Sequence, residues 1–581
     1  MKIVVPNNQR FLLLVGLVMV LCAVAAWSDY RQPHKAHVIF TNAEVLTMDA
    51  LNPKAAAVAV HGDQIIAVGD EAMVRKHESW FTRSIDLEGQ TLMPGLVESH
   101  THPVAASILY DWLDVSGFSH PKPDGVWQAL QEAVAQAEPG EWIYAFGLDP
   151  LLTAGIQLPD RKQLDEIAPD NPLFILSQVM HTVYFNSALL AAVDLDESAA
   201  DPQGGHFDRY DNGSLNGVAH ENAIGMLIGT NEQGLFERLA QAWGVRKAMI
   251  SQYEQYAAGG ITTIGVLGPV PMFEGYLGFL EHVATRRASP LRTIVFPLTE
   301  ELEKSGYELG YQNEHYQVTG VKLHLDGSPW TGGMATREPY EQNEFTQGVL
   351  KMSPDNIGLL KYSAEEFTRK YLDYHEAGWQ IAVHTHGERA HQLLLDTVDN
   401  VLAVSPREDH RHRMEHLGLL DLPDIKRAAQ LGVTPSFFID HIYFFGTAIE
   451  DVLVGKERAE RFMALQWATE HHERVSLHMD TPATPINPWR AMRTATTRIP
   501  RFATAPLNES QLMSQQDALE AMTIDAAWQL HMDDEIGSIE VGKQADFVVL
   551  SKNPLALPAD EWMKITAQET WLAGERVWQL Q

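Results

Sequence analysis

The stretch Leu92-Met93-Pro94-Gly95-Leu96-Val97-Glu98-Ser99-His100-Thr101-His102-Pro103 decides how the rest of the chain is organised. Pro94-Gly95 opens it and Pro103 closes it, a pattern typical of a β-strand between two turns. Side chains alternate across a strand, so His100 and His102 lie on one side of it. Two imidazoles placed in this way can bind one metal ion, and imidazole suits zinc. The alternative is a chance pair, because the chain holds 25 histidines.

Residues that bind metals or transfer protons also stand at the ends of four later candidate strands, each followed closely by a Gly or Pro turn. They are Lys322, His324 and Asp326 before Gly327; His384 and His386 before Gly387; His416 before Gly418; and Asp480 before Pro482. Each has a structural alternative: a buried ion pair for the lysine, core imidazoles bonded to backbone, an ordinary turn at Asp326-Gly327, or a helix cap at Asp480. Their joint occurrence is much harder to explain by accident and favours one shared site.

Six of these groups have a coherent chemical role as a set that holds one or two divalent ions. The set is His100, His102, Lys322, His384, His416 and Asp480. A lysine ammonium cannot bind a metal, but the amine of Lys322 can do so after reaction with CO2 to a carbamate. A bound ion lowers the pKa of water towards 7, giving hydroxide at neutral pH, and polarises a carbonyl. Asp480, beside that water, is expected to accept its proton and to deliver it to a leaving nitrogen.

From Pro94 to about residue 530, apolar strands alternate with amphipathic helical runs, which is typical of a parallel β/α architecture. The predicted strands include Thr262–Val266, Val321–Leu325, Gln380–Val383, Met414–His416, Val433–Phe438 and Val475–Met479, and the predicted helices include Ala364–His375, Ala390–Val404 and Leu422–Leu431. In a closed parallel barrel, catalytic groups lie at the C-terminal ends of the strands, where the polar residues above stand. Residues 104–250 fit the alternation poorly and are expected to hold an insertion.

The two ends of the chain share a different pattern of short β runs and turns. Residues 37–93 contain such runs at Val38–Phe40, Ala56–Val60 and Ile65–Val68, and residues 531–581 contain them around Phe547–Leu550 and Thr570–Leu572. We expect the two ends to pair into one small sheet domain, with the long middle inserted between them.

Composition excludes some classes of partner. The net charge is −33, from 43 basic and 76 acidic residues, which argues against binding to nucleic acid or to anionic membrane surfaces. A hydrophobic content of 45% is that of an ordinary globular protein with a large core. We expect a small-molecule substrate, but composition itself says nothing about the substrate and does not indicate an oligomeric state.

The N-terminus, residues 1–27, resembles a secretory signal peptide. Lys2 and Arg10 precede an uncharged segment from Phe11 to Trp27, and Ala23-Val24-Ala25 matches an A-x-A cleavage site. An uncleaved membrane anchor is the alternative, although the segment is short for a comfortable span of roughly 20 residues. Cys22 is the only cysteine, so a cleaved product has neither disulfides nor a catalytic thiol. The protein is accordingly expected to be exported, periplasmic or extracellular, or tethered to the membrane by residues 11–27.

Two further groups of histidines stand in charged surroundings, at Asp409–Arg413 and at Glu470–Arg474. Charged neighbours are typical of solvated turns. We expect both groups to lie at the surface and to take no part in the site.

At this point the sequence resembles a known family, the amidohydrolase superfamily of metal-dependent hydrolases, and most closely its branch called amidohydrolase family 3, or YtcJ-like. The resemblance covers about residues 37–580. It rests on five internal motifs and one near the C-terminus: Leu92–His102 resembles P-G-(aliphatic)2-D-(S/A)-H-x-H; Gly320–Gly327 resembles V-K-(aliphatic)-F-x-D-G; Val383–Ala390 resembles V-H-x-x-G-D-x-A; Arg413–His416 resembles R-(aliphatic)-E-H; Met479–Pro485 resembles S-D-x-P-x-x-P; and Gly537–Leu550 resembles G-S-(I/L)-E-x-G-K-x-A-D-(aliphatic)3-L.

The resemblance implies a (β/α)8 TIM barrel over residues 94–530, with a small β-sandwich built from residues 37–93 and 531–581. It implies that His100, His102, Lys322, His384 and His416 are metal ligands, with Lys322 the bridging residue, and that Asp480 is the catalytic acid/base. His181, in a segment similar to G-H-x-x-W-x-N-S, is implied to face the substrate. Four positions depart from the family pattern: Glu98, His324, His386 and Glu388 stand where Asp, Phe, an apolar residue and Asp are usual.

The sequence thus predicts an exported, zinc-dependent amidohydrolase that cleaves a C–N bond with metal-activated hydroxide. Deamination or ester hydrolysis on the same scaffold is the alternative within enzymes. A binding or regulatory protein that retains the fold is the alternative outside them. Aromatic residues near the predicted strand ends are candidates for an apolar pocket, although such residues more often belong to the core. They are Trp330, Tyr340, Phe437, Phe438, Tyr443, Phe444 and Phe445.

Overall fold

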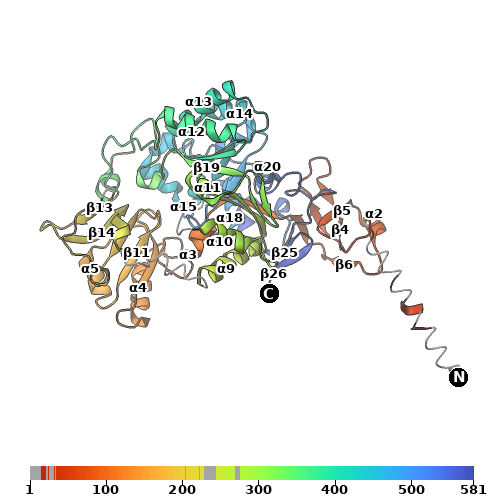
Figure 1. Ribbon diagram of the computed structural model, residues 1–581, viewed down its shortest axis with the longest axis horizontal. Helices are drawn as coiled ribbons and strands as arrows, with labels where there is room; N and C mark the ends of the chain where they lie inside the picture. The colour runs from red at the N-terminus through yellow and green to blue at the C-terminus, as the bar shows by residue number, and fades with distance from the viewer. Residues whose placement is uncertain are drawn as a thin grey trace.

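The computed structural model describes residues 34–202, 205–221, 223–227, 244–268 and 275–581, and a few positions between 15 and 32. The predicted leader, residues 1–27, lies almost entirely outside the described residues. The chain folds as a mixed α/β protein in which a central group of parallel strands has further β-sheets on two sides (Figure 1). Within the described part, no helix is both long and apolar enough to cross a membrane.

Eight parallel strands occupy the centre and belong to two five-stranded sheets. The first sheet contains β8 (Leu96–Thr101), β15 (Ile261–Leu267) and β16 (Arg292–Phe296), extended by the short strands β18 (Tyr316–Val318) and β17 (Tyr311–Asn313). The second sheet has the order β19 (Gly320–His324), β20 (Gln380–Thr385), β21 (Arg413–His416), β22 (Thr434–Phe438) and β23 (Ser476–His478). These elements confirm the six strands predicted between residues 262 and 479, to within about two residues at each end.

The two central sheets meet along both of their edges. On one side, a parallel bridge joins Leu298, just after β16, to Lys322 on β19. On the other side, β23 lies against β8: the backbone N–H of Met479 donates to Glu98 Oε1 at 3.1 Å, and Ser99 Oγ donates to the carbonyl of Leu477 at 3.4 Å. The C-terminal ends of all eight strands are therefore brought towards a common face.

Amphipathic helices cover the outside of these strands and bury the main core against them (Figure 1). α12 (Ala364–Glu376), α13 (Glu388–Val404) and α14 (Leu422–Gln430) confirm the three predicted helices. A reciprocal pair of hydrogen bonds between Ser363 and Glu366 starts α12. Its buried residues recur at every fourth position, so they form one stripe that faces the sheet: Phe367, Tyr371 and His375.

The two ends of the chain meet in a separate pair of sheets, at the right of Figure 1. β7 (Thr91–Pro94) pairs antiparallel with β24 (Phe547–Leu550), which confirms the predicted pairing of the chain ends. The six-stranded sheet that contains this pair has the order β26-β25-β24-β7-β2-β3, and the facing sheet has the order β5-β4-β1-β6. The two share one core, in which Phe40 lies edge-on to Phe547 and Trp571. Because β7 runs directly into β8, this pair of sheets fixes where the first central strand begins.

A third unit stands between β8 and β15 in the sequence, at the left of Figure 1. It is a six-stranded mixed sheet of the order β13-β14-β12-β11-β10-β9, with two small cores of its own. Its strands are β9 (Leu113–Asp114), β10 (Ile143–Leu148), β11 (Leu173–Ser177), β12 (Thr182–Phe185), β13 (Gly205–Arg209) and β14 (Leu215–Glu221), and α4 (Pro123–Gln136) and α5 (Arg161–Ile167) pack on it. We call this unit the insertion sheet. The domain boundaries drawn from the sequence stay predictions.

The expectation that the histidines of Asp409–Arg413 are solvated is wrong. His410 and His412 are buried, and His412 Nε2 lies 2.9 Å from Nδ1 of His375 on α12. The reason is that β21 begins at Arg413, so the residues just before it enter the core with the strand. The charged side chains that suggested a surface turn, Asp409 and Arg411, pair with each other, and of the two only Asp409 is exposed.

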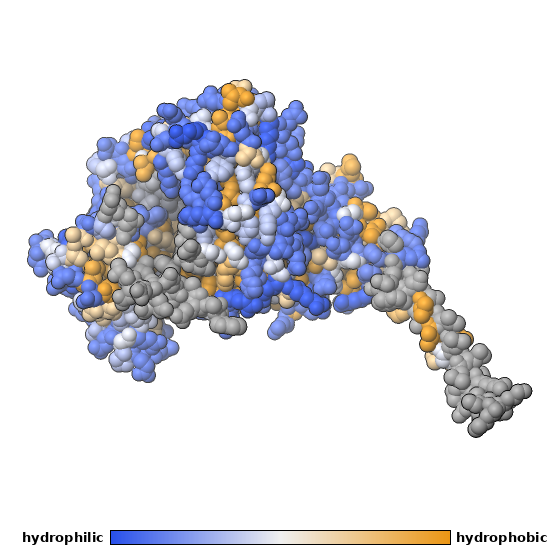
Figure 2. Space-filling view, viewed as in Figure 1, coloured by the Kyte–Doolittle hydropathy of each residue, from blue (hydrophilic) through white to orange (hydrophobic). Residues whose placement is uncertain are grey.

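The visible surface is mainly polar. In the view of Figure 2, hydrophilic residues dominate the face of the central part, and apolar residues appear in scattered patches.

Candidate metal centre

Two histidines at the end of β8 open the candidate site. His100 is the fifth residue of β8, and His102 follows the strand and directly precedes α3 (Pro103–Ile108). Their ring centroids lie 5.3 Å apart. His100 is fully buried, whereas the side chain of His102 is 16% exposed. The opening pair therefore has one deep member and one member close to the mouth of the site.

Asp480 and Lys322 reach this pair from opposite sides. Asp480 Oδ1 lies 3.0 Å from His102 Nε2 and 3.7 Å from His100 Nε2, so these three residues form one candidate metal-binding group. Lys322 Nζ, on β19, lies 3.4 Å from His100 Nε2. β8, β19 and the end of β23 thus present an amine, two imidazoles and a carboxylate to one point.

A second candidate group lies beside the first and shares its surroundings. His384 and His386 at the end of β20 join His416 at the end of β21, with ring centroids 4.4 to 5.0 Å from that of His416. His416 in turn lies 4.8 Å from His100 between ring centroids, and its Nδ1 lies 3.8 Å from Asp480 Oδ2. The structure therefore brings together all six residues predicted as ligands. It also adds His386, one of the departures from the family pattern, to the same cluster.

His478 belongs to the cluster, and the sequence analysis missed it. It is fully buried on β23, and its Nε2 lies 3.2 Å from His416 Nδ1. Together with His100 and His416 it forms a third candidate group. A signal was present, because His478 stands two residues before Asp480 and alternation puts both on one side of the strand.

Buried groups behind the ligands hold two of the imidazoles in one orientation. His100 Nδ1 lies 2.8 Å from Glu415 Oε2, and a carboxylate can only accept, so Nδ1 carries the proton and Nε2 faces the cluster with a lone pair. Glu415 is itself paired with Arg413 at 2.7 Å, with both side chains fully buried. In the same way, Ser436 Oγ lies 3.0 Å from Nδ1 of His478.

Asp326, for which an ordinary turn was the alternative, fixes the loop after β20. Its carboxylate accepts hydrogen bonds from the backbone N–H groups of His386, Gly387 and Ala335. Gly387 is needed at this point, because a side chain there would collide with the backbone of Ala335. Asp326 is therefore a structural partner of the histidine pair, and burial raises the pKa of this carboxyl to about 7.

The backbone is strained at two residues of the cluster. His416 has a φ of 77° and Asp480 a φ of 59°, in the left-handed region that residues other than glycine rarely adopt. Such strain persists only where surrounding packing enforces it, and it gathers at functional sites. Both residues follow or end a strand, so this conformation turns their side chains towards the cluster.

Burial sets the charge state of the cluster. Burial first, and then neighbouring basic side chains, hold the pKa of His100, His384, His416 and His478 well below the ordinary value, so these imidazoles are neutral. The same cause lowers the pKa of His386 to about 3 and that of Lys322 to about 8. Neutral imidazoles and a partly neutral amine are the states in which these groups bind metals or react with CO2.

Several buried atoms of the cluster lack a hydrogen-bond partner: His102 Nδ1, His384 Nε2, His386 Nδ1 and Asp480 Oδ1. Asp480 Oδ1 is close to His102 Nε2, at 3.0 Å, but the two atoms are not aligned as a hydrogen bond. A buried polar atom left without a partner costs about 1–3 kcal/mol. Lone pairs of this kind, from nitrogen and carboxylate oxygen, are what zinc and similar divalent ions accept. The donor set thus fits a divalent metal ion.

His181 lies apart from the cluster. Its side chain is 50% exposed and its Nδ1 lies 2.9 Å from Glu221 Oε1. Both line a cavity of about 630 Å³ between the insertion sheet and the loop that contains Trp330. None of the cluster residues lines this cavity, but Trp330 in its wall connects it to them, because its indole donates at 3.1 Å to His441, whose ring stacks on that of His386. We call it the entrance cavity.

Among the aromatic residues proposed for a pocket, only Trp330 lines this cavity. Tyr340, Phe437, Phe438 and Phe445 belong to the buried core. Phe445 supports Trp330 by stacking on it with ring centroids 4.0 Å apart. Most of these aromatic residues therefore position the site from behind.

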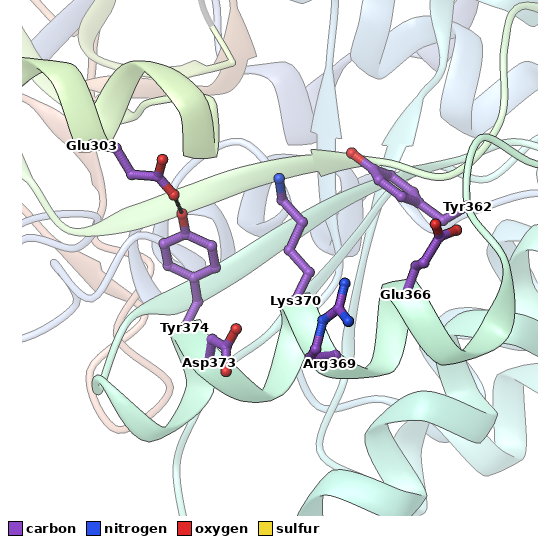
Figure 3. Close-up of a pocket in the computed structure, with 7 residues that line it drawn as sticks. All are labelled: Glu303, Tyr362, Glu366, Arg369, Lys370, Asp373 and Tyr374. Carbon is purple, nitrogen blue, oxygen red and sulfur yellow. Dashed lines mark hydrogen bonds between the residues drawn. The ribbon is translucent and has the colours of Figure 1, made fainter.

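A smaller cavity of about 370 Å³ lies between α12 and α11 (Thr299–Ser305) (Figure 3). It is lined by polar side chains: Glu303, Tyr362, Glu366, Arg369, Lys370, Asp373 and Tyr374. Tyr374 donates to Glu303 at 3.0 Å, as Figure 3 shows. None of the cluster residues lines this cavity, so it is separate from the candidate site.

Comparison with known proteins places this geometry in context. The model of the Amidohydrolase family matches residues 83–578. The chain is 28% identical over 533 residues to Protein LONG AFTER FAR-RED 3 from Arabidopsis thaliana, covering 89% of this chain and 88% of that protein. It is 25% identical over 542 residues to N-substituted formamide deformylase from Arthrobacter pascens, covering 92% of this chain and 97% of that protein.

Among solved structures, the fold is similar to that of an uncharacterized metal-dependent hydrolase from Pyrococcus horikoshii OT3. The TM-score is 0.69 and the sequence identity 21%, with 90% of this chain and 99% of that chain covered. At this identity the likeness concerns the fold. The match from residue 83 to residue 578 includes the central strands and every residue of the cluster.

Proposed function

Because the chain belongs to the amidohydrolase family, we propose that it is a zinc-dependent hydrolase that cleaves a carbon–nitrogen bond of the amide type. The observation that supports this most strongly is the convergence of His100, His102, Lys322 and Asp480 with the histidines of β20 and β21. These groups come from five strands and meet where catalytic residues of parallel β/α folds stand.

We infer that the eight central strands act as a (β/α)8 barrel and that the paired chain ends act as a β-sandwich beside it. The contacts of β8 with β23 and the bridge from Leu298 to Lys322 support closure of the barrel. In this arrangement the C-terminal strand ends surround one opening, and loops after the strands determine which substrates enter.

The residues that would hold the metal are His100, His102, Lys322, His384, His416 and Asp480, with one or two ions and with Lys322 carboxylated in the two-ion form. A divalent ion there would supply Lewis acidity, which lowers the pKa of water and polarises a carbonyl. His386 and His478 lie close enough to join the set or to hold its members in place.

Asp480 is proposed as the general acid/base. Its Oδ1 has no hydrogen-bond partner and lies between the two opening imidazoles, so it is placed to accept a proton from water and to return it to a leaving nitrogen. The substrate would approach from the entrance cavity, past Trp330. His181 on the opposite wall would contact it there.

The substrate class proposed is an N-substituted formamide or another simple amide. Similarity to N-substituted formamide deformylase over almost the full length of both chains supports it. The other relative, Protein LONG AFTER FAR-RED 3, has a name that indicates no reaction. The cluster lies deep, with Lys322 and His100 almost fully buried, which suits a small acyl group at the reacting end.

The test is a screen of N-formyl and N-acyl amines against protein loaded with zinc, followed by metal analysis of the active form. We expect release of formate or acetate, at least one zinc per chain, and loss of activity on chelation that zinc restores. Less than half an equivalent of zinc, with no activity gained on adding it, contradicts the proposal. Release of ammonia from a ring amine, or hydrolysis of esters alone, would identify a deaminase or an esterase instead. A zinc-loaded protein with no turnover on any class would indicate a binding protein.

We propose further that residues 1–27 export the chain, or tether it to a membrane if they are not removed. The support is the charged start followed by the uncharged segment from Phe11 to Trp27. Fusing the segment to a reporter that is active only outside the cytoplasm tests this. A silent reporter rejects export, and an N-terminal sequence of the secreted product that begins after Ala25 rejects the tether.

A further inference from the structure

The insertion sheet contains a second group of metal-ligand residues on its edge hairpin. β13 and β14 pair antiparallel, with His206 directly opposite His220. His206 and Asp208 stand two residues apart and lie on one face of β13, while Phe207 between them is buried in the core on the other face. All three polar residues line the entrance cavity.

The three side chains converge closely enough to share an ion. Asp208 Oδ1 lies 3.4 Å from His220 Nε2 and 3.8 Å from His206 Nε2, and one ligand atom of each residue lies within 4.8 Å of the others. The two imidazoles stack with centroids 4.4 Å apart. Around a tetrahedral ion with bonds of about 2.0–2.2 Å, ligand atoms are about 3.3–3.6 Å apart. Small rotations of the side chains reach that geometry.

A neighbouring hydroxyl orients one of these candidate ligands. Thr182 Oγ1, on β12, lies 3.2 Å from His220 Nδ1. A hydrogen bond from Nδ1–H to this hydroxyl leaves the lone pair on Nε2, the atom that faces Asp208.

From this geometry we propose that His206, Asp208 and His220 form a second binding site for a divalent transition-metal ion such as zinc, separate from the catalytic cluster. Two imidazoles and one carboxylate are a ligand set that zinc, cobalt and nickel accept. Three protein ligands leave a fourth tetrahedral position open, and the site faces the entrance cavity. The side chain of His206 is 58% exposed, so the ion would exchange with solvent.

The proposal is independent of the catalytic cluster, since its residues come from the insertion sheet alone. Two variants of the full chain separate the two sites. His206→Ala/His220→Ala removes the imidazoles of the second site, and His100→Ala/His102→Ala removes the opening pair of the cluster. His282→Ala, at an exposed histidine of α10 (Tyr276–Ala284), is the matched control.

The measurement is equilibrium dialysis of each protein against micromolar Co²⁺ and Zn²⁺, with metal content per chain and the visible Co²⁺ spectrum as readouts. We expect His206→Ala/His220→Ala to bind one equivalent less than the wild type and to lose one component of the Co²⁺ spectrum. His282→Ala should match the wild type, and His100→Ala/His102→Ala should retain the lost component.

The conservative variant Asp208→Asn guards against a folding defect, because it keeps the size of the side chain and removes only its charge. It should weaken the same equivalent while the circular dichroism stays that of the wild type. The proposal is overturned if His206→Ala/His220→Ala has the same metal content and the same Co²⁺ spectrum as the wild type, whatever the outcome at the catalytic cluster.

Discussion

Nδ1 of His100 lies 2.8 Å from Oε2 of Glu415, although 315 positions separate the two residues in the chain. This contact fixes the lone pair of Nε2 towards the cluster, and Arg413 holds the carboxylate from behind. The candidate metal centre would therefore depend on a buried relay of contacts that begins on β21 and ends on β8.

Replacing Glu415 by Gln tests this relay. The neutral side chain loses the charge that pairs with Arg413 and holds His100, so we expect zinc affinity to fall by about 10–100-fold, the usual effect of losing a partner behind a metal ligand. Competition with a chromogenic chelator measures it. Asp546→Asn is the matched control, because Asp546 forms a buried ion pair with Arg292 at the start of β16, the end of the strand opposite to the end where the cluster lies. Equal zinc affinity in Glu415→Gln and Asp546→Asn would show that the relay does not serve the metal.

Lys322 is expected to take up CO2. Burial lowers the pKa of its amine to about 8, so at pH 8.5 most of it is neutral, whereas an ordinary lysine stays almost fully protonated. Protein incubated with ¹³C-bicarbonate and zinc should show a carbamate resonance that Lys322→Met lacks. A wild-type spectrum without this resonance would leave Lys322 as an uncarboxylated amine and remove it from the ligand set.

Asp480→Asn should remove the general acid/base. We expect kcat on the substrate found in the screen to fall by about 10²–10⁴-fold. Asp525→Asn, at another buried aspartate that pairs with Arg474 away from the cluster, should keep kcat within a few-fold of the wild type. A variant of Asp480 with near-normal kcat would mean that the proton moves through another group.

His410 should make the stability of the metal-free protein depend on pH. Burial lowers its pKa to about 4, below the ordinary value of 6.5, so the unfolded chain binds this proton first. The contribution of neutral His410 to the free energy of unfolding is therefore fully present above about pH 6.5 and is lost as the pH falls towards 4. The free energy of unfolding of the wild type, minus that of His410→Gln, should decrease by on the order of 2 kcal/mol between pH 7 and 4.5. Urea titrations measure it, and a difference independent of pH would mean that His410 is not buried neutral.

Much of the fold and of the cluster is visible in the sequence because it is local. The strand ends at His100 and His384 each combine an apolar run, a polar pair and a turn residue, and the structure has strands there. A spacing of two residues along a strand shows which side chains share a face. The same rule, applied to the residues before Asp480, identifies His478.

A local sequence pattern cannot reveal contacts between residues that are far apart in the chain. The strands of the insertion sheet pair across as many as 38 positions, as Thr182 on β12 does with His220 on β14, so their short apolar runs do not reveal a partner. His410 and His412 look polar in sequence, yet they are buried because β21 starts beside them. Glu415 shows the same limit, since only the fold reveals that it contacts His100.

Anomalous X-ray diffraction at the zinc absorption edge, from crystals of the zinc-loaded full chain, tests the central claim most directly. The account predicts strong anomalous density within bonding distance of His100, His102 and Asp480, next to His384 and His416. Zinc-replete crystals with no anomalous density at this cluster would contradict it.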